Sequence, residues 1–203
     1  MNAGKGFQSA YKQSYPVGKS VLRKAEMRWS ADAPLSYIRS ELGSDPLALV
    51  ILLVTPQANF ENVVTEASRE FSDTDVMACT TAGEISANGY DEGLIVAIGF
   101  PEKDFASRSI LFREIDKLSQ QDVVNQIALE RMALQEECRE LTNPFAFLAV
   151  DGLSLSEDTL AASMAAALTD MPLFGGSAGD GTDFRNTLVS LNGEIAQKAA
   201  VLN

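Results

Sequence analysis

Two short runs of unbroken apolar residues stand out along the chain, at 47–54 and 145–150. Turn residues precede each run, Asp45-Pro46 before the first and Asn143-Pro144 before the second. A short apolar run that is bounded by turn signals is typical of a strand buried on both faces. The chain is therefore expected to contain two buried strands about 100 residues apart, as in an α/β fold.

The same order of elements follows each buried strand. A helical apolar pattern comes next, with Asn59 predicted as the N-cap of the first helix and Ser156 as the N-cap of the second. A second strand follows, at 75–80 in the first half and at Leu173-Phe174 in the second, where Phe174 is expected in the core. Each half then closes with two more strands, predicted at 94–100 and 109–112 and, joined by an Asn192-Gly193 hairpin, at 188–191 and 199–202.

The turns after the second strands are also alike. One reads Thr81-Ala82-Gly83-Glu84 and the other Ser177-Ala178-Gly179-Asp180, each a small hydroxyl residue, alanine, glycine and an acid. We therefore predict an α/β fold with layered mixed sheets and helices, built from two copies of a β-α-β-β-β unit at 45–112 and 143–203. The alternative is a chance likeness of two strand–helix–strand units.

Two further segments complete the predicted organisation. Residues 1–44 are expected to form an N-terminal arm and a short helix capped by Asp32. A long helix over 119–141, beginning at Ser119, joins the halves; its apolar positions are Ile127, Leu134 and Leu141, seven residues apart. This helix either packs on the sheet as a surface helix or forms a coiled coil with a partner.

Composition and charge narrow the possible functions. The formal net charge of −12 opposes binding to a phosphate backbone, so no nucleic acid partner is expected. The sequence has no histidine, the most usual general base and metal ligand. Its longest apolar run is too short for membrane insertion, no signal peptide is apparent, and Cys79 and Cys138 are its only cysteines. A reducing, cytoplasmic location is expected.

The glycine-rich segment 173–181 suggests three kinds of chemistry. Gly175 to Gly179 fits the G-x-S-x-G pattern of a serine nucleophile, but the chain has no histidine base and the following residues indicate a loop. A phosphate cradle would face repulsion from Asp180 and Asp183. The third possibility is close approach to a small ligand, with Ser177, Asp180 and backbone N–H groups as polar contacts. The alternative is that the glycines only form a tight turn.

Other candidate residues lie at the ends of predicted strands. Thr80, Thr81 and Glu84 occupy the corresponding turn of the first half. Asp151 directly follows a buried strand, which is a usual place for a functional carboxylate, although an Asx-type turn explains it equally well. Cys79 is either a buried structural thiol or a reactive one. Carboxylate spacing matches no calcium loop, so no metal site is predicted.

Two stretches resemble the signature sequences of the FIST N-terminal domain. They are Cys79-Thr-Thr-Ala-Gly-Glu-Ile85 and Leu173-Phe-Gly-Gly-Ser-Ala-Gly-Asp180, and the resemblance covers roughly residues 45–203. It implies a sensory domain of bacterial signal transduction that binds an amino acid or related metabolite. It also implies two partners that this chain does not contain: a C-terminal FIST domain, and an output module such as a kinase or cyclase.

The resemblance implies in addition which residues line or shape the site. They are Thr80, Thr81, Gly83, Gly176, Ser177, Gly179 and Asp180; our own reading of the residues adds Glu84 and Asp151. We predict a ligand-binding domain that is not an enzyme and has no cofactor. One alternative, implied by some family members, is haem-based nitric oxide sensing, in which Cys, Met or Tyr would have to ligate the iron. The other is an enzyme with Ser177 or Cys79 as nucleophile.

Overall fold

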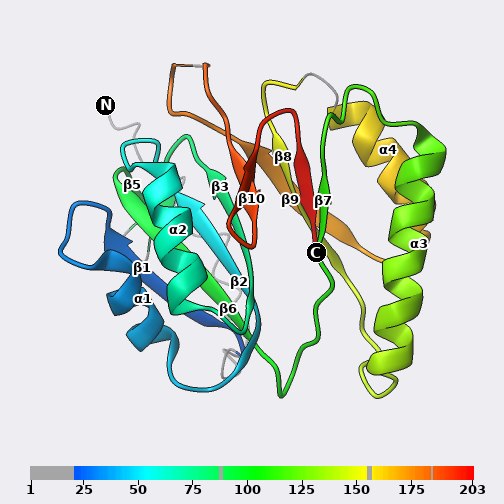
Figure 1. Ribbon diagram of the computed structural model, residues 1–203, viewed down its shortest axis with the longest axis horizontal. Helices are drawn as coiled ribbons and strands as arrows, with labels where there is room; N and C mark the ends of the chain where they lie inside the picture. The colour runs from blue at the N-terminus through cyan, green and yellow to red at the C-terminus, as the bar shows by residue number, and fades with distance from the viewer. Residues whose placement is uncertain (1–20, 87–88, 155–156, 184) are drawn as a thin grey trace, which may run out of the picture.

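Two mixed β-sheets pack face to face, and a pair of helices covers the outer face of each sheet (Figure 1). The structure, a computed structural model, describes residues 21–86, 89–154, 157–183 and 185–203. The layers run helices, sheet, sheet, helices across the molecule. The predicted α/β class with layered mixed sheets is confirmed.

Within the described residues the first sheet has six strands and the second has four. In order across the first sheet they are β1 (Arg23–Arg28), β6 (Leu94–Pro101), β2 (Leu47–Val54), β3 (Asp75–Thr80), β10 (Val189–Leu191) and β11 (Glu194–Ala196). Across the second sheet they are β7 (Ile110–Phe112), β12 (Ala200–Leu202), β8 (Ala146–Asp151) and β9 (Leu173–Ala178). A separate small hairpin consists of β4 (Glu84–Ser86) and β5 (Gly89–Asp91).

The helices lie on the outer faces of the sheets. The first sheet carries α1 (Pro34–Leu42) and α2 (Phe60–Glu70), and the second carries α3 (Gln120–Glu137) and α4 (Glu157–Leu168). Two of them are crossovers between parallel strands, since α2 connects β2 to β3 and α4 connects β8 to β9. The carboxyl ends of all four parallel strands therefore point to one end of the sandwich, as the contacts between their turns also show.

Strand pairing in the two sheets follows one pattern. The order β1-β6-β2-β3 in the first sheet matches β7-β12-β8-β9 in the second. In both orders the last pair, β2-β3 or β8-β9, is parallel and the two pairs before it are antiparallel. Common origin of the halves by duplication stays a prediction, but the matched topology is what a duplication would leave.

Two strands belong to different sheets from those we expected. Strand β7, predicted in the first half, pairs with β12 of the second sheet, with Leu111 opposite Val201. Strand β10, predicted in the second half, pairs with β3 of the first sheet. Asn192-Gly193 forms a hairpin as predicted, but it joins β10 to β11 rather than to 199–202. Both residues have positive φ, 50° and 89°, as such tight hairpins require.

The unbroken apolar run of β2 serves two cores at once. Val50, Leu52 and Val54 pack in the layer between the first sheet and its helices. Leu49 and Ile51 point the other way, into the layer between the two sheets. Alternate side chains of a strand face opposite sides, so a strand buried on both faces must be apolar throughout. The predicted burial of this strand is confirmed.

Helix starts were predicted with mixed success. Asn59 caps α2 by accepting from the Asn62 N–H at 3.0 Å, and Ser119 caps α3 by accepting from the Asp122 N–H at 3.2 Å. The prediction for Asp32 is wrong, since Ala33 occupies the cap position of α1 with φ 48° and no side-chain bond. Ser156 lies outside the described residues.

Two apolar residues are more exposed than their patterns suggested. Helix α3 ends at Glu137 and buries Val123 and Ile127, whereas Leu141, beyond its end, is largely exposed. Phe174 is 51% exposed, so its prediction as core is wrong. It lies on β9, an edge strand of the second sheet, and stacks on Phe145 with ring centroids 5.5 Å apart.

Candidate functional site

The two alike turns of the sequence meet at one end of the sandwich. The Gly179 N–H donates to the Thr80 carbonyl at 3.0 Å, and the Gly181 N–H donates to the Thr81 carbonyl at 3.1 Å. Residues 80–84 and 177–181, together with Asp151, are called the turn junction below. The structure thus brings the predicted turns side by side, as two strand ends at one edge allow.

Glycines let the two turns approach closely. A Cβ placed on Gly179 would lie 2.8 Å from both the Cβ and the nitrogen of Ala82. Gly83 has φ 137° and lies under the Tyr90 ring, so a side chain there would be both strained and obstructed. By contrast, a Cβ on Gly176 would have no neighbour within 4 Å. Gly83 and Gly179 are therefore needed for packing, whereas Gly176 is open.

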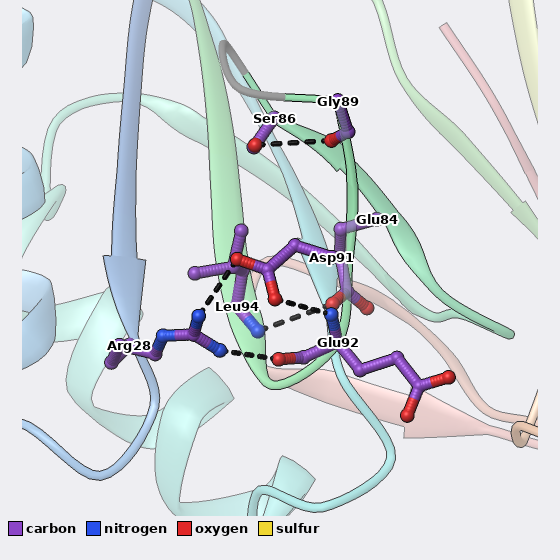
Figure 2. A network of polar contacts seen from close by, with 7 residues as sticks. All are labelled: Arg28, Glu84, Ser86, Gly89, Asp91, Glu92 and Leu94. Atoms are coloured by element: carbon purple, nitrogen blue, oxygen red, sulfur yellow. Dashed lines mark hydrogen bonds and ion pairs between the residues drawn. The ribbon is translucent and has the colours of Figure 1, made fainter.

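Glu84 is a buried carboxylate with its own protein donors, of which the Leu94 N–H is drawn in Figure 2. One of its oxygens accepts from the Thr81 hydroxyl, and the other accepts from the Leu94 N–H at 3.1 Å. Nearby, the Arg28 guanidinium donates to the carboxylate of Asp91 on β5 at 2.7 Å and so holds the other strand of the β4–β5 hairpin. Glu84 therefore fastens the β4–β5 hairpin to the start of β6.

Asp151 is also buried and fully engaged in local structure. It accepts from the backbone N–H groups of Leu153 at 3.0 Å and Lys198 at 2.5 Å, and from the Thr187 hydroxyl. The bond to Leu153, two residues on, is the Asx-type turn that the sequence left open. Because the other two donors come from distant segments, Asp151 ties β8 to the segments that precede β10 and β12.

The remaining polar residues of the turn junction hold loops as well. Asp180 accepts from the backbone N–H groups of Arg185 at 2.5 Å and Asn186 at 2.8 Å. The Thr80 hydroxyl oxygen accepts from the Leu188 N–H at 3.1 Å. The Ser177 hydroxyl donates to Glu157 at 2.6 Å, on an exposed part of β9. Contact of these residues with a ligand stays a prediction.

Neither proposed nucleophile is activated in this structure. The carboxylate of Glu157 is the described partner of the Ser177 hydroxyl, and the sequence contains no histidine. Burial raises the pKa of the Cys79 thiol to about 12, because the thiolate would lose its water. At neutral pH this cysteine is a protonated core residue, packed between the two sheets.

A cavity of about 680 Å³ lies at the opposite end of the sandwich, near the amino ends of β2 and β8. Its walls include the inner side of α3, the segment 104–108 and the segment 141–147. None of the nine predicted site residues lines this amino-end cavity. The sequence offered a weak signal for it, in the phenylalanines Phe100, Phe105, Phe145 and Phe147, which fall in two separate stretches of the chain.

Comparison of the sequence with models of known protein families identifies the family of this chain. The model of the FIST N domain matches residues 48–202, most of the chain. The chain belongs to the FIST family. FIST domains are sensory domains of signal-transduction proteins, so the resemblance drawn from the two signature stretches is confirmed.

Both signature stretches lie at the turn junction. In this FIST domain the two stretches form the contact between the turn that follows β3 and the turn that follows β9. No curated protein and no solved structure matches the chain. Among the described residues, no helix combines the length and the apolar character needed to cross a membrane.

Proposed function

We propose that this FIST domain is a small-molecule receptor whose ligand is an amino acid or related metabolite, and that it has no catalytic activity. The observation that carries the proposal is the amino-end cavity. Its volume of about 680 Å³ falls within the range of roughly 300–1,000 Å³ that is usual for ligand sites. A sensory domain needs such a space, and the family match supplies the sensory role.

The enzyme alternative finds less support. Cys79 is buried with a raised pKa, and Ser177 lies beside the Glu157 carboxylate rather than beside a histidine. At the turn junction the two halves are joined by the hydrogen bonds from Gly179 and Gly181 to the carbonyls of Thr80 and Thr81. We propose that the turn junction transmits a conformational change from one half to the other. This role would be additional to any contact that the turn junction makes with the ligand.

Partners follow from the proposed sensory role. The C-terminal FIST domain and the signalling output module would need a surface on this domain. Strand β9 lies at the edge of the second sheet. On it, the Phe174 side chain is 51% exposed to solvent and stacks on the Phe145 ring. Open strand edges with apolar side chains are surfaces that other domains commonly cover. We propose that the C-terminal FIST domain packs here.

The test of the proposed function is a thermal-shift screen of amino acids and related metabolites on the domain. At least one compound is expected to raise the midpoint of thermal unfolding as its concentration rises, because a ligand that binds only the folded state stabilises it. An absorption spectrum of the purified protein, taken before and after adding haem, checks the nitric oxide alternative. A screen without any stabilising compound, or turnover of a stabilising compound, would contradict the proposal.

A further inference from the structure

The amino-end cavity has an aromatic wall. Phe100 and Phe105 meet edge to face with ring centroids 5.3 Å apart, and Phe145 lies 6.3 Å from Phe100 and 6.4 Å from Phe105. All three rings line the cavity, together with Phe147. Rings in such an arrangement present faces and edges that favour a flat aromatic group, and ring faces also attract cations.

One carboxylate oxygen on the cavity lining is left without a hydrogen-bond donor. The Oδ2 atom of Asp104 is shielded from solvent and has no hydrogen-bond partner among the described residues. Its nearest cation is the Lys103 ammonium at 3.9 Å, which is beyond hydrogen-bond distance. Buried acceptors of this kind are rare, since leaving them unpaired is costly. The Asp104 side chain as a whole is 34% exposed on the cavity lining, so rotation of its carboxylate about χ2 would let a ligand N–H group supply a donor.

The cations on the cavity lining, in contrast, are already engaged by the protein. Arg108 pairs with Glu137 and lies 3.8 Å from Glu130. Arg131 donates to the carbonyl oxygens of Ala167 at 2.6 Å and Leu168 at 3.3 Å, at the end of α4. A ligand carboxylate would have to compete with these protein acceptors for the guanidinium groups. A ligand amine would meet, at Asp104, a carboxylate with an oxygen that has no hydrogen-bond donor among the described residues. The polar lining therefore favours a donor over an acceptor.

We propose that the amino-end cavity binds an aromatic amine, with its ring against Phe100, Phe105 and Phe145 and its ammonium group at the Asp104 carboxylate. This inference rests on the proposed small-molecule function and states which class of ligand that site selects. Charge selection comes from Asp104, and affinity for the ring comes from the phenylalanines. An amino acid with an aromatic side chain belongs to this class through its ammonium and ring.

Three indoles of similar size test the charge selection by isothermal titration calorimetry. Tryptamine carries an ammonium group, tryptophol a hydroxyl and indole-3-propionate a carboxylate. We expect tryptamine to bind at least about tenfold more tightly than indole-3-propionate, the ratio that one charge-assisted hydrogen bond provides. Equal affinities, or tighter binding of the carboxylate, would overturn the inference.

Two pairs of variants locate the binding. Asp104→Asn should bring the affinities of the three indoles together, whereas Asp116→Asn should keep the preference; both carboxylates are 34% exposed and lie near a lysine. Leu134→Trp should abolish binding by filling the cavity that Leu134 lines, whereas Leu129→Trp, at a site 67% exposed on the same helix, should not. The unfolding midpoint of each variant shows that it is folded.

The outcomes separate this inference from the proposed function. If Leu134→Trp is poorly folded, Phe105→Ala serves in its place, and a weaker affinity for all three indoles is expected. Unchanged binding in these variants would overturn the inference. If none of the indoles binds but a compound from the metabolite screen stabilises the domain, the sensory function stands and the aromatic-amine site is wrong.

Discussion

Gly179 and Ala82, one from each of the two alike turns, lie in direct contact. The Gly179 N–H reaches the carbonyl of Thr80 at 3.0 Å, and a Cβ on Gly179 would come within 2.8 Å of Ala82. This contact joins the ends of β3 and β9, which belong to different sheets. The halves of the sandwich are therefore locked together at the residues that carry the family signature.

Gly179→Ala should weaken this lock. The added methyl group would push into Ala82 backbone and side chain, and overpacking of this kind costs about 1–3 kcal/mol. Gly176→Ala is the control, because nothing lies within 4 Å of its Cβ position, and its effect should stay within about 0.5 kcal/mol. Urea unfolding of both variants measures the difference. Equal stability of the two variants would show that the turns do not touch as described.

Phenylalanine positions should differ sharply in their contribution to stability. Phe112 is fully buried under α3 and α4, so Phe112→Ala should lower the free energy of unfolding by about 3–5 kcal/mol. Phe174 is half exposed and retains only its ring contacts, so Phe174→Ala should cost about 1 kcal/mol. A loss at Phe174 as large as that at Phe112 in denaturant titrations would contradict its exposed position.

Asp151→Asn should destabilise the domain by about 2–3 kcal/mol, since it removes charge-assisted acceptance from three donors and turns an amide group toward backbone N–H groups. Asp32→Asn is a suitable control, because Asp32 is exposed and does not cap α1. Guanidinium unfolding compares the two. If both substitutions had the same small effect, Asp151 would not hold β8 to its neighbours.

The two cysteines should react at different rates. In the native protein at pH 8, iodoacetamide should modify the half-buried Cys138 and leave Cys79 intact until denaturant is added, because burial raises the pKa of Cys79 to about 12. Peptide mass mapping identifies the modified residue. Rapid modification of Cys79 in the native state would revive its role as a nucleophile.

The same thiol predicts a dependence of stability on alkaline pH. Its pKa is raised on folding from 9.0 to about 12, so the unfolded chain releases the proton first as the pH rises. The stabilising contribution is complete below pH 9 and is lost as the pH approaches 12. Cys79→Ala should therefore lose stability less steeply between pH 9 and 12 than the unmodified protein. If the free energy of unfolding fell equally with pH in the two proteins over that range, the raised pKa would be contradicted.

Local patterns in the sequence predicted local elements well. The run 47–54 gave β2 with its observed bounds, and Asn59 and Ser119 cap the helices that they were expected to cap. These features depend on residues that are neighbours in sequence, such as a side chain and an N–H group three residues on. The fold class followed from the same short-range patterns.

Long-range pairing could not be predicted in the same way. Nothing in the residues of β7 or β10 says in which sheet they lie, because a three-residue strand carries little pairing information. Phe174 looked like core because apolar residues usually are, yet its strand is at an edge. The convergence of the two turns was predictable from strand direction, whereas the amino-end cavity depends on phenylalanines brought together only by the packing of the two sheets.

A backbone amide NMR titration with the most strongly stabilising compound from the metabolite screen tests whether the amino-end cavity is the ligand site. We predict that the largest chemical shift changes lie at residues 104–108 and on the inner side of α3, with smaller changes at the turn junction. Changes confined to residues 80–84 and 176–181, or no changes at saturating concentration, would contradict it.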